Sequence, residues 1–123
     1  SAPNRTILVL LLRKLGFSVI ECDDGEKAWN ALEASGDKKI VAVISDIMMP
    51  KMDGLELLRR VRNNKSMETL PFMLVTAVSD KDYIFEAKNL NVSGYILKPV
   101  TFQRVSSKLQ EVFPNKKFPK LAG

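Results

Sequence analysis

The chain alternates between short apolar runs and segments whose apolar residues recur at helical spacing. The runs are rich in β-branched or aromatic residues, which favours strands, and they are residues 41–44, 72–75 and 95–97, with 19–20 as a weaker candidate. Between them lie Ala28, Trp29 and Leu32; Leu55, Leu58 and Val61; and Phe102, Val105, Leu109 and Val112, each set on one helical face. Unbroken apolar strands that alternate with helices predict an α/β fold, with a parallel sheet covered on both faces.

The apolar run at residues 7–12 can form a strand or a buried helix on periodicity alone. Its flanks favour a helix, because Pro3 suits a first turn and Gly16 suits a C-cap. The apolar positions also follow helical spacing, at Leu8, Leu11, Leu12 and Leu15. Six apolar residues are too few to cross a bilayer. We therefore expect an N-terminal helix and no membrane segment.

The amino-acid composition excludes several kinds of functional site. With 123 residues, 46% of them hydrophobic and 27% charged, the chain has the size and balance of one globular domain. It contains no histidine and a single cysteine, Cys22, which excludes a histidine base, an internal disulfide and a Cys/His zinc site, and favours a reducing cytoplasm. The net charge of +5 comes from scattered basic residues, so we expect solvated faces rather than a nucleic-acid surface.

Polar residues follow three of the predicted strands directly. Asp46, Thr76 and Lys98 stand at the carboxyl ends of these strands, where parallel sheets bind ligands. Each has an ordinary structural reading: a loop cap, a strand-end hydroxyl and a surface cation. Together, a carboxylate nucleophile that faces a hydroxyl and a cation suits phosphoryl transfer, in which negative charge on the phosphoryl oxygens must be stabilised.

Four stretches of the chain carry a resemblance to a known family. They are "LLRKLGFSVIECDDGEKAWNAL", "VISDIMMPKMDGLELLRRVR", "LPFMLVTAVSD" and "SGYILKPVT". The chain resembles the receiver domain of two-component response regulators, especially the stand-alone chemotaxis-type receivers. The resemblance implies a flavodoxin-like, doubly wound parallel sheet of five strands. It assigns residues 1–113 to the receiver domain and leaves residues 114–123 as a basic C-terminal tail.

The resemblance also implies roles for individual residues. Asp46 matches the aspartate that accepts a phosphoryl group, and Thr76 and Lys98 match the residues that contact the phosphoryl oxygens. Asp46 and the backbone carbonyl of Met48 match ligands of a Mg²⁺ cofactor. Tyr95 matches an aromatic residue whose rotamer follows phosphorylation. Thr76 and Tyr95 are therefore expected to act as the switch.

The expected switch is a local movement with a wider effect. Movement of the Thr76 hydroxyl toward a phosphoryl oxygen leaves room into which Tyr95 can turn. The segment from residue 79 to residue 113 should then present a different surface in the two states. The bond between Lys98 and Pro99 matches a position that is commonly cis in the family.

The function implied is that of a phosphoacceptor signalling module and not of an enzyme with substrates of its own. A sensor histidine kinase or a histidine phosphotransfer protein would supply the phosphoryl group, and a downstream target protein would read the altered surface. Met48 and Val78 are apolar where receivers border the attacking water, so we expect slow loss of the phosphoryl group. A pseudo-receiver that binds proteins without regard to phosphorylation is the alternative. No nucleic acid or membrane partner is expected.

One part of the family pattern is not found where it is expected. Receivers begin with a strand that ends in two acids, which help hold Mg²⁺, whereas here that strand would end just before Ser1. Asp23 and Asp24 follow the second strand instead, and either Asp23 or Asp24 is expected to be the N-cap of the next helix. Glu26, three residues after Asp23, indicates a capping box. The further acidic ligands are thus expected to be absent from this chain. Three explanations remain open: the chain is part of a longer protein, it is a rearranged chain, or it borrows the strand in a swapped dimer. We favour the first. A phosphorylation-dependent dimer is the other oligomer that we consider.

Overall fold

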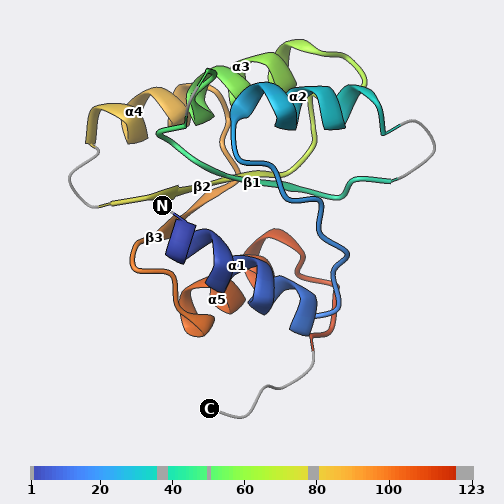
Figure 1. Cartoon of the computed structure of the whole chain (residues 1–123), viewed down its shortest axis with the longest axis vertical. Coiled ribbons are helices and arrows are strands. Elements are labelled where there is room, and N and C mark those ends of the chain that lie inside the picture. Colours follow the sequence, from blue (N-terminus) through green and yellow to red (C-terminus); the bar gives the residue numbers. More distant parts are fainter. Residues whose placement is uncertain (1, 36–38, 50, 78–80, 119–123) are drawn as a thin grey trace.

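The computed structural model describes residues 2–35, 39–49, 51–77 and 81–118. Helices and strands alternate after an initial pair of helices (Figure 1). In chain order the elements are α1 (Ala2–Lys14), α2 (Gly25–Glu33), β1 (Val43–Asp46), α3 (Gly54–Asn63), β2 (Phe72–Thr76), α4 (Lys81–Asn89), β3 (Gly94–Leu97) and α5 (Phe102–Val112).

The described strands form one parallel sheet in the order β1-β2-β3. β2 lies in the centre and all five of its residues are buried. Helices α2, α3 and α4 lie on one face of the sheet, and α1 and α5 lie on the other (Figure 1). The expected α/β class with a covered parallel sheet is confirmed. Three strands are present among the described residues, so the five-strand count of the family stays a prediction.

Each face of the sheet has its own apolar core. On one side Leu57, Leu58 and Val61 of α3 pack with Phe72 and Leu74 of the central strand. On the other side the core comprises Leu8, Leu12, Leu15, Met73, Val75, Ile96, Val100, Val105 and Leu109. Successive residues of β2 thus point to opposite cores, as the pleat of a strand requires.

The N-terminal apolar run is a helix, as its flanking residues predicted. Leu8 and Leu12 of α1, and Leu15 directly after it, are buried against the sheet and α5. Gly16 has φ 97°, a left-handed conformation that glycine adopts at low cost after the last turn of a helix. None of the helices among the described residues is long and apolar enough to cross a membrane.

Two features differ from the sequence-based expectation. Val19 and Ile20 do not form a strand, because a strand requires a ladder with a neighbour and no described strand pairs with residues 17–22. Ile20 is 59% exposed. Helix α4 was not anticipated, and its sequence explains why: Phe85 is 69% exposed and only Ala87 is buried, so the apolar pattern of the helix is weak.

Arg62 fastens the end of the sheet at which the strands begin. Its guanidinium donates hydrogen bonds to the carbonyl oxygens of Leu70 (2.7 Å), Glu68 (3.1 Å) and Asn91 (3.0 Å). Burial lowers the pKa of Arg62 from its ordinary value, and no acid pairs with it in these contacts. One side chain of α3 thereby joins the segment that enters β2 to the turn that follows α4.

We expect Arg62→Lys to lower the free energy of unfolding by about 1–3 kcal/mol, because an ammonium cannot reach all three carbonyls in the geometry of the guanidinium. Urea unfolding followed by circular dichroism measures the change. Arg60→Lys on the exposed face of the same helix is the matched control and should change stability by less than about 0.5 kcal/mol. Equal effects of the two substitutions would contradict a special role for Arg62.

Candidate functional site

The sheet register brings the three predicted polar residues to one edge. Asp46 is the last residue of β1 and lies opposite Val75, and Thr76 is the last residue of β2 and lies opposite Leu97. Lys98 follows β3 at once, and its backbone N–H donates to the Thr76 carbonyl (2.8 Å), which extends the parallel ladder by one bond. The carboxyl ends of all three strands therefore meet where the sequence predicted.

Asp46 and Lys98 form an ion pair. Lys98 Nζ lies 2.9 Å from Asp46 Oδ1, and the side chains are 30% and 20% exposed, respectively. A partly exposed pair of this kind contributes little to stability, about 0–1 kcal/mol. The pair also places a positive charge beside the Asp46 carboxylate, whose Oδ1 is buried while the side chain as a whole stays partly exposed. A group added to this carboxylate would lie next to the ammonium.

Thr76 is buried at the end of β2. Its hydroxyl donates a hydrogen bond to the carbonyl oxygen of Ala77 (3.1 Å). The hydroxyl is thus held by the chain just beyond the strand, on the same edge as the ion pair. Val78, the apolar residue expected near the attacking water, lies outside the described residues.

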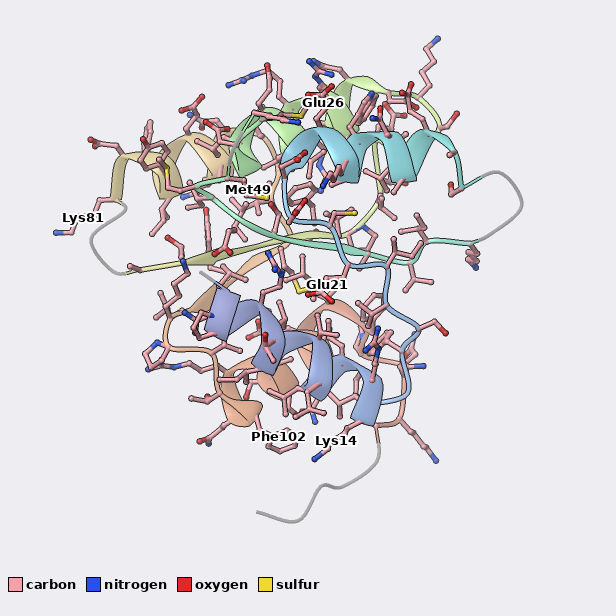
Figure 2. All side chains as sticks on the ribbon, in the orientation of Figure 1. Lys14, Glu21, Glu26, Met49, Lys81 and Phe102 are labelled. Atoms are coloured by element: carbon pink, nitrogen blue, oxygen red, sulfur yellow. The ribbon has the colours of Figure 1, made fainter. Side chains whose placement is uncertain are left out.

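The loop after β1 turns back sharply against the strand end. The Gly54 N–H donates to the Ile47 carbonyl (2.7 Å), and a Cβ on Gly54 would lie 2.2 Å from the Asp46 carbonyl oxygen. Only glycine fits this approach without displacing the residue that carries the carboxylate. Within the loop, Met49 lies between the sheet and the layer of helices that contains α2 and α3 (Figure 2). The Met48 side chain is 65% exposed.

Tyr95 connects β3 with α4. Its ring is half-buried, and its hydroxyl donates a hydrogen bond to the Ile84 carbonyl (2.8 Å). Burial raises the pKa of this hydroxyl above its ordinary value of 10.0. The side chain that is expected to move therefore holds a helix and a strand together in this structure.

The acids at positions 23 and 24 are structural in this fold. Asp24 is the N-cap of α2 and accepts from the Lys27 N–H (2.8 Å), while Asp23 pairs with Lys27 Nζ (2.8 Å). The expected capping box with Glu26 is wrong, because the cap is one residue later and Lys27 occupies the third helical position. Burial and the two aspartates raise the pKa of the neighbouring Cys22 thiol, so it stays protonated at neutral pH.

The described residues supply few metal ligands at this edge. No group of three or more Asp, Glu, His or Cys side chains in the described ranges could hold a metal ion. Asp46 and the Met48 carbonyl, the ligands expected from the sequence, would provide one carboxylate and one carbonyl oxygen. Mg²⁺ takes six oxygen ligands in octahedral geometry. This partial set does not by itself make a strong Mg²⁺ site.

Two further polar side chains contact the loop that carries Lys98, and the sequence reading did not single them out. Asn4 Oδ1 accepts a hydrogen bond from the Val100 N–H (3.1 Å), and the Arg104 guanidinium donates to the Pro99 carbonyl (2.8 Å). The peptide bond between Lys98 and Pro99 is cis, the isomer that the sequence resemblance suggested. The Asn4 contact has no local sequence signal, since Asn4 and Val100 are 96 residues apart, and the Arg104 contact has none because its acceptor is a backbone carbonyl.

Comparison with known proteins identifies the family. The family model for the response regulator receiver domain matches residues 1–110. The chain belongs to this family, and it is a receiver of the chemotaxis type within two-component signalling. Receivers interact with histidine kinases and with downstream targets, and they are signalling modules.

Several chemotaxis proteins are similar to the chain. The chemotaxis protein CheY of Pseudomonas aeruginosa is 39% identical over 110 residues, which cover 89% of this chain and 86% of the relative. The chemotaxis protein CheY1 of Helicobacter pylori is 34% identical over 113 residues, which cover 91% of this chain and 90% of the relative.

Solved structures agree with the fold. A response regulator from Chloroflexus aurantiacus has a TM-score of 0.81 at 26% identity, and the match covers 94% of this chain and 92% of the other. Vibrio cholerae CheY4 has a TM-score of 0.77 at 26% identity, with 91% of both chains covered. The receiver domain of the Pseudomonas aeruginosa sensor histidine kinase PA1611 has a TM-score of 0.74 at 23% identity, and the match covers 89% of this chain and 88% of the other. That structure holds a magnesium ion in its active-site cleft.

The state of Tyr95 can be tested by titration. In a Tyr83→Phe variant, Tyr95 is the only remaining tyrosine, so phenolate absorbance near 295 nm reports on it alone. We expect the midpoint to lie above pH 10, because burial favours the neutral phenol. Since the folded pKa is raised, the stability that this group contributes is fully present below pH 10 and is lost as pH rises through the raised pKa. A midpoint at or below pH 10 would show that the ring is not buried as described.

Proposed function

We propose that this chain is a phosphoacceptor module of a two-component phosphorelay, in which Asp46 receives a phosphoryl group from a sensor histidine kinase or a histidine phosphotransfer protein. The observation that carries the proposal is the Asp46 carboxylate with the Lys98 ammonium at 2.9 Å, at the strand edge that Thr76 also reaches. A nucleophile, a cation and a hydroxyl at one place are what phosphoryl transfer to a carboxylate requires.

The proposed reaction exchanges one bond to phosphorus for another. A carboxylate oxygen of Asp46 attacks the phosphorus of a phosphohistidine while the bond from phosphorus to the imidazole nitrogen breaks. The electron pair of that bond stays on the nitrogen, and Asp46 becomes an acyl phosphate. Lys98 stabilises the negative charge on the phosphoryl oxygens beside it. Attack by water on the same phosphorus later returns the carboxylate and inorganic phosphate.

Mg²⁺ is the cofactor we propose, as in the receiver of PA1611, and it would supply charge stabilisation for the phosphoryl oxygens. The ligands available among the described residues are the Asp46 carboxylate and the Met48 carbonyl. Because this set is small, we expect weak Mg²⁺ binding and slow phosphorylation of this chain.

The proposed response to phosphorylation starts at Thr76 and ends at Tyr95. The Thr76 hydroxyl would leave the Ala77 carbonyl for a phosphoryl oxygen, and Tyr95 would exchange its bond to the Ile84 carbonyl for a more buried position. Because that bond ties β3 to α4, its loss would change the surface formed by α4, β3 and α5. A downstream target protein would bind one of the two surfaces. We place this signalling in the cytoplasm.

A phosphorylation-independent protein-interaction module is the second candidate. One observation favours it: the described residues contain no cluster of three potential metal-ligating side chains. Such a module would keep the fold and the surface of α4, β3 and α5 without responding to phosphate. Binding of a phosphoryl mimic separates the two candidates.

Asp46→Asn should abolish phosphoryl uptake, because an amide is a poor nucleophile and cannot form the acyl phosphate. The measurement is intact-protein mass spectrometry after incubation with Mg²⁺ and phosphoramidate, a small phosphoryl donor. The wild-type chain should slowly gain one phosphoryl group, and the variant none.

Asp53→Asn is the matched control for this experiment, because Asp53 caps α3 in the same loop through its side-chain oxygen, which an amide retains. It should label like the wild type. A phosphoryl group on Asp53 or any residue other than Asp46 would contradict the assignment, and no uptake by the wild type together with no binding of beryllofluoride would favour the interaction module.

Lys98→Ala should block the response to phosphate more than the uptake itself, because the cation acts on the added phosphoryl oxygens whereas the nucleophile remains. Beryllofluoride with Mg²⁺ is the probe, and the amide NMR signal of Tyr95 is the readout. The wild type and the exposed control Lys65→Ala should shift on addition of the mimic. A full shift in Lys98→Ala would show that Lys98 does not transmit the signal.

A further inference from the structure

We propose that Asn4 and Arg104 are positioning residues for Lys98: α1 and α5 each hold one side of the loop from which the Lys98 ammonium reaches Asp46. The proposal deepens the proposed function, since it concerns the cation that would act on the phosphoryl group. It rests on the hydrogen bonds around Lys98, which come from separate elements of the fold.

Asn4 holds the loop from the first turn of α1. Its Oδ1 accepts a hydrogen bond from the Val100 N–H (3.1 Å), in a partly buried position. The Val100 side chain is buried and packs in the same apolar cluster as Leu8 and Ile96. The chain two residues after Lys98 is therefore fixed by both its backbone and its side chain.

Arg104 holds the loop from the first turn of α5. Its guanidinium donates to the Pro99 carbonyl (2.8 Å) and lies at the longer distance of 3.5 Å from the Leu97 carbonyl. These two carbonyls flank Lys98 in the chain. The backbone N–H of Arg104 also donates to the Thr101 hydroxyl (3.2 Å), the N-cap of α5, so the guanidinium starts from a fixed helical turn.

The backbone around Lys98 is thus tied to β2, α5 and α1 in turn. Lys98 N–H bonds to the Thr76 carbonyl, the Pro99 carbonyl to Arg104, and the Val100 N–H to Asn4. A lysine side chain is long and flexible, and movement of its backbone would add to the volume that its Nζ can sample, so a backbone held on both sides of Lys98 reduces that volume. Displacement of a reacting group by about 1 Å can cost about a hundredfold in rate, which gives such ties a functional effect.

Bonds that only stabilise the fold would have a different consequence from bonds that position Lys98. A loss of general stability loosens the whole domain, whereas a loss of positioning releases one ammonium from its carboxylate. Lysine acetylation distinguishes the two, because an ion-paired amine reacts more slowly than a free one. The other lysines of the same chain serve as internal references.

The experiment measures the rate at which each lysine of the full chain is acetylated by an N-hydroxysuccinimide ester, by mass spectrometry of peptides. Arg104→Ala and Asn4→Ala should each raise the rate at Lys98 by about two- to fivefold, the factor that a partly exposed ion pair is worth. Asp46→Asn sets the upper limit. The rates at Lys65 and Lys88, which are exposed elsewhere, should not change.

Two conservative variants and one control substitution complete the acetylation experiment. Asn4→Asp keeps an acceptor oxygen for the Val100 N–H, and Arg104→Lys keeps one donor for the Pro99 carbonyl, so both should return the Lys98 rate toward the wild-type value. Gln103→Ala, an exposed neighbour of Arg104 on the same helical turn, should have no effect.

An unchanged Lys98 rate in Arg104→Ala and Asn4→Ala would overturn the proposal, as would an equal rise at all lysines. So would an unchanged rate in Asp46→Asn, because the ion pair itself would then be absent. The test requires neither a phosphoryl donor nor a metal ion. Failure of phosphoryl uptake by the wild type would therefore contradict the proposed function and leave this result standing.

Discussion

Parallel pairing of the central strand β2 with both neighbours is the constraint on which the rest of the structure depends. Because the three strands run in one direction, their carboxyl ends meet at one edge, and residues distant in sequence become neighbours there. The same pairing sends alternate side chains of β2 into two separate cores. Those cores hold the helices whose first turns border the site. The polar edge is thus a direct result of how an apolar strand is paired.

The sequence predicted most of this edge because its signals are local. β2 reads as an unbroken apolar run, α1 carries leucines at helical spacing, and Asp46, Thr76 and Lys98 each follow a run directly. Because the strands are parallel, residues that follow the strands in the sequence lie at the same edge of the sheet in space. The need for glycine at Gly54 is likewise visible as a loop signal, although its cause, the approach to the Asp46 carbonyl, is visible only in the structure.

The remaining features depend on contacts between distant segments, which no local pattern records. Residues 17–22 include β-branched side chains but have no neighbouring described strand, so the strand predicted there from β propensity was wrong. Helix α4 buries too little apolar surface to show a clear period. The bond from Val100 to Asn4 joins two ends of the chain, and the contact from Arg104 reaches backbone carbonyls, which every residue possesses.

The Arg62 guanidinium holds α4 near one end, and the Tyr95 hydroxyl holds it near the other through the Ile84 carbonyl. The bond from Arg62 to the Asn91 carbonyl fastens the turn after α4 at the edge where the strands begin, far along the helix from the start of α4, which lies toward the opposite edge with Asp46. The ion pair between Arg59 and Glu86 (2.6 Å) adds a second tether partway along. If Tyr95 gave up its bond to the Ile84 carbonyl, the contacts of Arg62 and Arg59 would still hold the later part of the helix, so the first turn would move most. This arrangement lets a local event at the sheet edge change the surface of the protein while the core beneath it stays in place.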